Sequence, residues 1–215
     1  MAHYSLPLFP LNVVIFPEGL LPLRIFEARY LDMVRACLRN KTNFGVVAVY
    51  AESNPKNSLK YDDSLEQKSV LPFASVGTSF TILDADVTEP GLINVHCLGK
   101  QRFSVKSASQ QKDGLWIGEV EDIANDGNMT IPDDLQTTKI HLQKLIEAIA
   151  SQDIKELDMP IGKPYKLDDC AWVANRWCEI INMPLIQKQR MLELDSPLVR
   201  LELIQDILAI EFSEK

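Results

Sequence analysis

The sequence predicts an α+β protein, with a β-rich N-terminal part that contains one helix and a C-terminal helical bundle. Up to about Asp122, short runs of β-branched and aromatic residues alternate with Gly, Pro, Asn and Asp, a pattern typical of strands and turns. After the polar segment IANDGNMTIPDD, residues 123–134, apolar residues recur with a helical period instead. We therefore expect two subdomains, residues 1–124 and residues 125–215.

Seven runs of the N-terminal part are predicted to be strands. They read LPLFPL, NVVIF, FGVVAVY, SVLPFASVGTSFTIL, LINVHCLG, QRFSVKSA and LWIGEVED. The stretch PEGLLP, residues 17–22, is interpreted as a turn because it combines Gly with two Pro residues. Around it, the residues expected in the core are Phe9, Val13, Ile15, Ile25 and Phe26.

One helix is predicted inside the β-rich part, because apolar residues from Phe26 to Leu38 repeat at helical spacing. Glu27 lies in its first turn, where a negative charge is favourable against the helix dipole. Arg29 is expected to pair with a carboxylate, so both charges are interpreted as structural. The apolar stripe consists of Phe26, Tyr30, Leu31, Val34, Cys37 and Leu38.

The C-terminal part is predicted to consist of helices that bury one apolar face each. The first of these helices is expected after residue 134 and the second from about Asp168. A third is expected from Pro184, and a final one after the Ser196-Pro197 cap. The first carries the stripe Leu135, Leu142, Leu145, Ile146 and Ile149, and the second buries Trp172, Val173, Trp177 and Ile180.

Charge and composition exclude several classes of protein. The 215-residue chain has a net charge of −8 and a pI near 4.9, which disfavours DNA or RNA as the main partner, since nucleic-acid binders gain affinity from a basic surface. No run approaches 18 uninterrupted apolar residues and the N-terminus has no basic lead, so neither a membrane span nor a signal peptide is expected. We expect a cytoplasmic protein. Its cysteines form no Cys-x-x-Cys pair and are expected to be free thiols: Cys37, Cys97, Cys170 and Cys178.

No catalytic, metal or cofactor site is predicted. The nearest approach to a phosphate-binding loop, NVHCLGKQ, lacks both the first glycine and the final hydroxyl residue. His3, His96 and His141 do not have the spacing of metal ligands. His96 and Cys97 are neighbours on a predicted strand and therefore point to opposite faces. The sequence thus predicts a protein that is not an enzyme.

A basic face is expected on the strand KQRFSVK. Strand alternation places Lys100, Arg102, Ser104 and Lys106 on one side of it. The simplest interpretation is a solvated sheet surface, and the other is a site for an anionic ligand.

The stretch LPLFPLNVVIFPEGLLPLRIFEARYLDMV, residues 6–34, resembles the start of the N-terminal domain of the ATP-dependent protease Lon. FGVVAVY, VGTSFTILDADVTEPGLINVHCLGKQRFSV and LDDCAWVANRWCEIINMPLIQKQRMLELDSPLVRLELIQDIL are similar to that family in the same order, so the resemblance covers about Ser5 to Ile210. It implies a PUA-like pseudo-barrel followed by a helical bundle, which in Lon helps to recognise unfolded or tagged substrates. The chain has neither the Walker lysine nor the Ser-Lys dyad of Lon, and so resembles a stand-alone substrate-recognition domain.

The resemblance implies a non-catalytic module that binds unfolded or exposed hydrophobic polypeptide segments, or one specific protein partner. Leu20 and Leu21 in the predicted turn are candidate contacts if they are exposed; the alternative is that both pack beneath the barrel. Tyr61 and the groove between barrel and bundle are further candidates. A second interpretation is a small-ligand or RNA-binding PUA-like module that uses the Lys100, Arg102 and Lys106 face. The sequence leaves the oligomeric state open.

Overall fold

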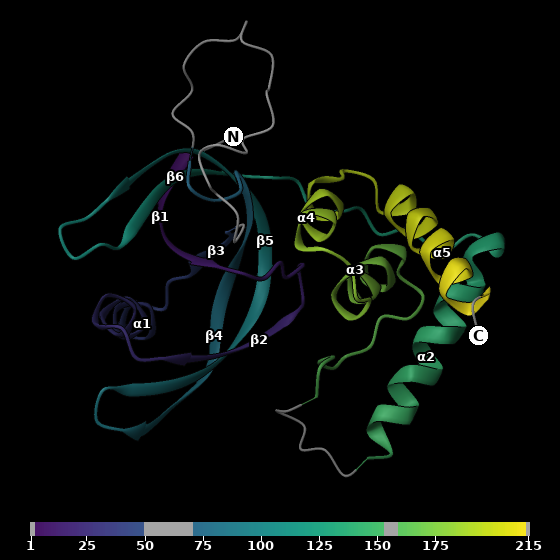
Figure 1. Ribbon diagram of the computed structural model, residues 1–215, viewed down its shortest axis with the longest axis horizontal. Helices are drawn as coiled ribbons and strands as arrows, with labels where there is room; N and C mark the ends of the chain where they lie inside the picture. The colour runs from purple at the N-terminus through teal and green to yellow at the C-terminus, as the bar shows by residue number, and fades with distance from the viewer. Residues whose placement is uncertain (1–2, 50–70, 153–158, 214–215) are drawn as a thin grey trace, which may run out of the picture.

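The computed structural model describes residues 3–49, 71–152 and 159–213. Within these residues the protein is a mixed α+β structure with a six-stranded sheet and five α-helices. Figure 1 shows the strands and the first helix on one side of the molecule and the remaining helices on the other. The α+β class predicted from the sequence is therefore confirmed.

The sheet is organised around one long strand, β5. One edge of β5 pairs antiparallel with β4, and the other edge is shared by β2 and β6. Because β3 pairs with β4, and β1 pairs with both β3 and β6, five strands form a closed ring to which β2 adds at an edge. The strands are β1 (His3–Leu11), β2 (Leu20–Ile25), β3 (Phe44–Ala48), β4 (Val76–Glu89), β5 (Leu92–Gln110) and β6 (Trp116–Asp122).

Two strand predictions around β2 are wrong. The run NVVIF, residues 12–16, is not a strand, and LLPLRI, assigned in part to a turn, is β2 itself. The cause is tertiary: Leu20 to Ile25 find hydrogen-bonding partners on β5, whereas Val14 and Phe16 pack into the helical core instead. The actual turn is confined to residues 16–19.

The helix α1 (Ala28–Asn40) covers one end of the sheet core, where Tyr30 stacks on Phe9 with ring centroids 3.8 Å apart. Two residues assigned to its buried stripe are exposed instead: Phe26 by 70% and Leu38 by 44%. Phe26 precedes the helix, and a repeat of four residues drifts by about 40° per step from the helical period. The predicted ion pair of Arg29 forms with Glu27, at 2.7 Å.

The C-terminal helices surround α3 (Cys170–Ile180), which is buried from Cys170 to Cys178. Asp169 caps this helix, since its carboxylate accepts a hydrogen bond from the Trp172 N–H at 2.7 Å. The predicted cap at Ser196 is confirmed by its hydrogen bond from the Val199 N–H. The other elements are η1 (Asp133–Leu135), α2 (Gln136–Ala150), α4 (Leu185–Glu193) and α5 (Pro197–Ser213).

The helical core extends into the β-rich part. Val14, Phe16, Ala48 and Ala74 belong to the same buried cluster as the apolar residues of α2 to α5. The sheet and the helices are therefore packed against each other through shared apolar contacts. None of the helices in the described part is both long and apolar enough to cross a membrane.

Candidate functional site

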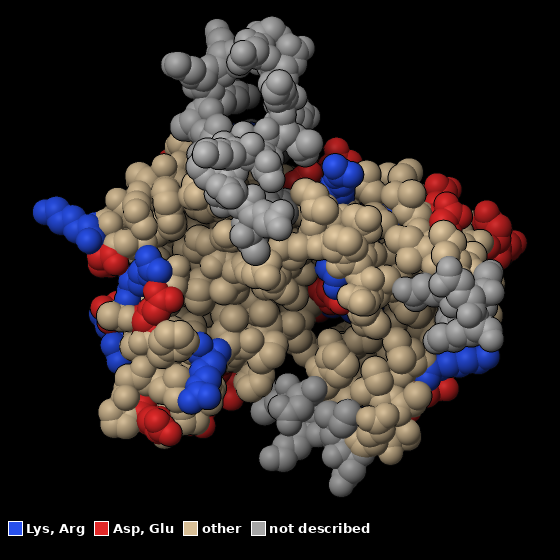
Figure 2. All heavy atoms as spheres, viewed as in Figure 1, with Lys and Arg blue, Asp and Glu red and all other residues tan. Residues whose placement is uncertain are grey.

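A cleft lies between the sheet and the helices and has two adjoining parts. The polar part has a volume of about 810 Å³ and is lined by β5, by the turn before β2 and by α3. The apolar part has a volume of about 730 Å³ and lies between β2 and the segment that precedes α3. Leu20, Leu83, Gly162 and Lys163 line both parts. Figure 2 shows the hollow between the two halves, with basic and acidic atoms beside it.

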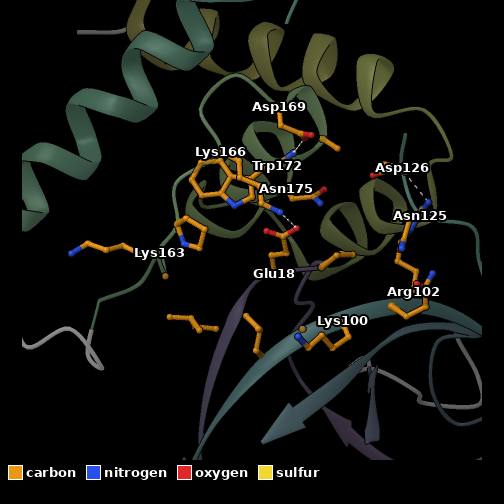
Figure 3. Close-up of a pocket in the computed structure, with 18 of the residues that line it drawn as sticks. Glu18, Lys100, Arg102, Asn125, Asp126, Lys163, Lys166, Asp169, Trp172 and Asn175 are labelled. Carbon is orange, nitrogen blue, oxygen red and sulfur yellow. Dashed lines mark hydrogen bonds and ion pairs between the residues drawn. The ribbon is translucent and has the colours of Figure 1, made fainter. Parts of the chain in front are cut away.

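Charged side chains from separate segments meet in the polar part. Lys100 and Arg102 come from β5, Glu18 from the turn before β2, and Asp126 from the segment after β6 (Figure 3). Residues of α3, among them Trp172, close the opposite wall. The site is therefore formed only when the sheet and the helices are packed together.

One side of the polar part is a buried ion network. Arg102 and Arg200 are 3% and 0% exposed, and they share the carboxylate of Asp126 at 3.0 Å and 2.7 Å. Both guanidinium groups also donate to backbone carbonyls at the C-terminal end of α4, in residues 191–194. These carbonyls have no partner within the helix, so the arginines satisfy them; Arg102 thereby fixes α4 against β5, and Arg200 fixes it against α5.

The turn before β2 is held from both sides. The Glu18 N–H donates to the Gly99 carbonyl of β5 at 2.9 Å, while Arg176 of α3 donates to the Glu18 carbonyl. The carboxylate of Glu179 accepts the Phe16 N–H at 2.9 Å. Glu18 itself has a φ of 64°, in the left-handed region that residues other than glycine rarely adopt. The helices thus hold the turn in a defined conformation at the edge of the cleft.

Burial perturbs the ionisation of Glu179. It raises the pKa of this carboxyl, and this effect exceeds the opposing effects of Arg176 and of the hydrogen bond from Phe16. Lys188 donates to the Glu179 carbonyl at 2.8 Å, and burial lowers its pKa. Both groups lie at the junction between turn and helix, so they contribute to its electrostatics.

Two exposed cleft residues lie at β-bulges. Ile82 pairs with Cys97 and Asp84 with His96, so Leu83 is the extra residue of β4; it is 54% exposed. On β5, Lys100 and Gln101 both lie opposite Ser79, between the pairs of Gly99 and Arg102, and form a second bulge. Bulges redirect side chains and are frequent beside functional sites. Here they accompany one apolar and one basic side chain in the same cleft.

The predicted contact residues Leu20 and Leu21 differ in their exposure. Leu21 is 7% exposed and packs in the sheet core, which agrees with the alternative that it lies beneath the barrel. Leu20, the neighbour on the opposite face of β2, is half-buried and lines both parts of the cleft. The alternation of a strand separates the two side chains, which a turn would not have done. Tyr61 lies outside the described residues.

The predicted basic face is also divided. Arg102 is buried in the ion network, so the expectation that it is exposed is wrong. Lys106 is exposed and pairs with Glu121 at 2.6 Å, outside the cleft. Lys100 lines the cleft and forms no ion pair among the described residues. A role of Lys100 and Lys106 in binding an anionic ligand stays a prediction.

The thiols do not have the properties of nucleophiles. All four are free and buried, and burial raises the pKa of Cys97 and Cys178 to about 12. A reactive cysteine requires the opposite shift, because the thiolate is the nucleophile. Among the described residues, no group of three or more His, Cys, Asp or Glu side chains is arranged to hold a metal ion.

Several residues of the site were not predicted from the sequence. Leu83 is an ordinary member of the run ILDADVTE, and Asp126 is one of many acids in a polar connection. The single available signal was the break in alternation around Leu83, where two apolar residues, Ile82 and Leu83, precede Asp84. For Asp126 no sequence signal exists, because its partners lie 24 and 74 residues away.

The comparison with protein families identifies this architecture. Residues 5–209 match the ATP-dependent protease La (LON) substrate-binding domain. The chain belongs to the Lon substrate-binding domain family. This match covers both the ring of strands and the helices, and therefore both walls of the cleft.

Solved structures agree with this assignment. The Lon N-terminal domain protein from Xanthomonas campestris is 28% identical, with a TM-score of 0.70 over 94% of this chain and 98% of the other. The N-terminal domain of Mycobacterium avium complex Lon protease has a TM-score of 0.58 over 94% and 97% of the two chains. At 16% identity, this second likeness shows the Lon N-domain fold alone. The comparison with curated proteins found no match.

Proposed function

We propose that this Lon substrate-binding domain is a non-catalytic polypeptide-binding module and that it holds an extended segment in the cleft between sheet and helices. Leu83 carries the proposal. It is a large apolar side chain that is more than half exposed, lies at a β-bulge and lines both parts of the cleft. Exposed apolar side chains in a concave surface mark binding sites for apolar partners.

The dimensions of the cleft support a bound segment and not a small solute alone. Each part has a volume within the range of about 300–1,000 Å³ that is usual for ligand sites, and the two adjoin through shared lining residues. The apolar part offers Leu20, Leu83 and Ile161 to one side chain of the segment. Unfolded chains expose such side chains, whereas folded proteins bury most of them.

Addition of a peptide strand to β2 is a less favourable mode of binding. The Gly19 carbonyl faces β5, so by alternation Pro22 directs its backbone towards the free edge of β2. A proline on this edge has no N–H to donate to an added strand. We therefore propose that side chains held in the cleft, and not a paired backbone, contribute most of the affinity.

The same proposal covers the finer architecture. We propose that the ring of β5, β4, β3, β1 and β6 is the PUA-like pseudo-barrel. We also propose that the chain divides into a β-rich subdomain, residues 1–124, and a helical subdomain, residues 125–215. The closure of β5 on both β4 and β6 supports the first part. Buried thiols with raised pKa values support a role without nucleophilic catalysis.

Fluorescence anisotropy tests the proposal. A fluorescein-labelled, permanently unfolded polypeptide is titrated with the wild-type protein, with the folded form of that polypeptide as control. We expect saturable binding of the unfolded form and at least about a tenfold loss of affinity in Leu83→Glu, the equivalent of about 1.4 kcal/mol, because a charge then lies in the apolar part.

Val87→Glu is the matched control variant. Val87 lies on the same strand and is 66% exposed, but it lines neither part of the cleft. Equal loss of affinity in both variants, with both folded, contradicts the cleft as the binding site. Absence of binding to the wild-type protein contradicts polypeptide binding itself. A double charge substitution at Leu20 and Leu21 is unsuitable for this test, because the charge at Leu21 would lie in the sheet core.

A further inference from the structure

We propose that the cleft selects segments in which an acidic side chain lies near a large apolar side chain, with the carboxylate in the polar part beside Lys100. This inference rests on the proposed polypeptide-binding function and specifies its substrate class. The apolar side chain would occupy the adjoining apolar part, between Leu20 and Leu83.

The polar part differs from the whole chain in its balance of charged side chains. Four cationic side chains line it, against three carboxylates, in a chain whose net charge is −8. Long-range attraction therefore does not bring an acidic segment to this protein, and any preference must arise locally. The cations are Lys100, Arg102, Lys163 and Lys166, and the carboxylates are Glu18, Asp126 and Asp169.

The carboxylates of the cleft are already engaged. Glu18 pairs with Lys166 at 2.6 Å, Asp126 binds two arginines, and Asp169 caps α3. Lys100, in contrast, is exposed and has no ion-pair partner among the described residues. The ammonium group of Lys100 is therefore available to a carboxylate of a bound segment.

The buried network is not a source of positive charge. Two guanidinium groups, Arg102 and Arg200, share the carboxylate of Asp126, and the carboxylate of Asp195 also acts on Arg102. The C-terminus of α4 contributes a further partial negative charge of about one half. The carboxylate of a bound segment is therefore assigned to Lys100 and not to these arginines (Figure 3).

The two parts are close enough for neighbouring residues of one segment. Leu20, Leu83, Gly162 and Lys163 line both, and His96, Leu98 and Lys100 follow one another along β5 from the apolar to the polar part. Successive residues of an extended chain advance by about 3.3 Å. A segment lying along β5 therefore brings an apolar and an acidic side chain to the two parts together.

The geometry points to an acidic side chain and not to a chain terminus. Lysines are flexible point charges, so they accept a carboxylate in several positions and do not require a fixed orientation. The residues shared by the two parts lie in the middle of the cleft, which extends beyond them in both directions. A segment can therefore pass through the cleft without ending in it.

Competition experiments test this inference. The labelled unfolded polypeptide is bound to the protein and displaced by short Gly-Ser peptides with blocked ends. Each contains one Phe and one Glu, separated by one to four residues, and each has a counterpart with Gln in place of Glu. We expect the most effective Glu peptide to compete about fivefold more strongly than its Gln counterpart.

Two charge-reversal variants locate the effect. In Lys100→Glu the preference for Glu over Gln should disappear. In Lys112→Glu, which makes the same change of charge at an exposed position outside the cleft, it should persist. A Gln peptide with a free C-terminal carboxylate tests whether the bound anion is the carboxylate of a chain terminus and not that of an acidic side chain.

The outcomes separate this inference from the proposed function. Equal competition by Glu and Gln peptides, or no competition by either, overturns the acidic selectivity while binding of the unfolded polypeptide still stands. A preference restored only by the free C-terminus overturns the assignment to a side chain. An equal effect of Lys100→Glu and Lys112→Glu overturns the assignment to the cleft. If the unfolded polypeptide itself does not bind, the proposed function fails first.

Discussion

The inside of the sheet and its junction with the helices are held together by different kinds of contact. In the sheet the largest fully buried side chains are apolar, as at Phe44, Phe80 and Phe103. At the junction, the largest buried side chains are arginines: Arg176 and Arg200 are 1% and 0% exposed. The first region depends on shape, and the second depends on charge and on the positions of backbone carbonyls.

This difference has an energetic consequence. An apolar core loses stability in proportion to the volume removed, so a small change has a small effect. A buried guanidinium that loses its counter-charge retains the full cost of its desolvation. The junction also forms the cleft, so its polar contacts fix the geometry of the proposed binding site. Changes of equal size in the two regions should therefore have unequal effects.

The largest effect is expected at Asp126. Asp126→Asn changes the side chain very little in size, but it leaves Arg102 and Arg200 without a shared carboxylate. We expect the free energy of unfolding to fall by about 3–5 kcal/mol in urea denaturation. The matched change in the sheet core, Ile25→Val, should lower it by only about 0.5–1.5 kcal/mol.

Asp86→Asn is the control for the loss of a carboxylate. Asp86 is exposed on β4, so its change should stay within about 0.5 kcal/mol of the wild type. If Asp126→Asn also falls within this range, the junction does not depend on its counter-charge and the contrast between the two regions is incorrect.

A smaller effect, dependent on pH, is expected at Glu179. Burial raises the pKa of this carboxyl above its ordinary value of 4.5, so the folded protein binds the proton more tightly than the unfolded chain does. The stability contributed by the protonated form is present below pH 4.5 and is lost as the pH rises through the pKa of the folded state. Glu179→Gln does not titrate, and its amide oxygen retains an acceptor for the Phe16 N–H.

Urea denaturation of both proteins at several pH values from 4 to 7 measures this difference. We expect the wild type to lose stability relative to Glu179→Gln as the pH rises from about 4.5. A difference that is constant with pH, or that grows in favour of the wild type, contradicts burial as the dominant influence on this carboxyl.

The smallest effect is expected for the exposed pair at the edge of the cleft. Lys166 and Glu18 join the helical side to the turn before β2, but their side chains are 46% and 45% exposed. Lys166→Gln should therefore lower the free energy of unfolding by less than about 1 kcal/mol, and by less still at high salt. A loss comparable to that of Asp126→Asn would show that exposed and buried charges contribute alike to the junction.

Local patterns predicted the helices more accurately than the strands. The stripe around Trp172 and the Ser196-Pro197 cap depend on residues within a few positions of one another, so the sequence contains all that is needed. The strand β2 was missed because its pairing with β5 joins residues 68 to 78 positions apart. Val14 and Phe16 had the composition of a strand, yet they pack against the helices.

The candidate site was predicted only in part. The groove between the two halves was expected, and Leu20 and Lys100 do line it. Arg102 was assigned to an exposed face but is buried, because a distant carboxylate neutralises it. For Leu21 both exposure and burial were left open, and it is buried because a strand separates it from Leu20. Leu83 was missed, since a single unpaired residue in β4 decides its orientation.

The sequence by itself determined the fold class, the membership of the Lon substrate-binding domain family and the positions of most helices, because these depend on composition, period and motifs along the chain. Only the tertiary structure decided which charges are buried and which apolar side chains are exposed. The physical reason is that both depend on partners distant in sequence. Asp126 gains its role from Arg102 and Arg200, and Lys100 gains its role from the cleft that forms when the sheet and the helices pack together.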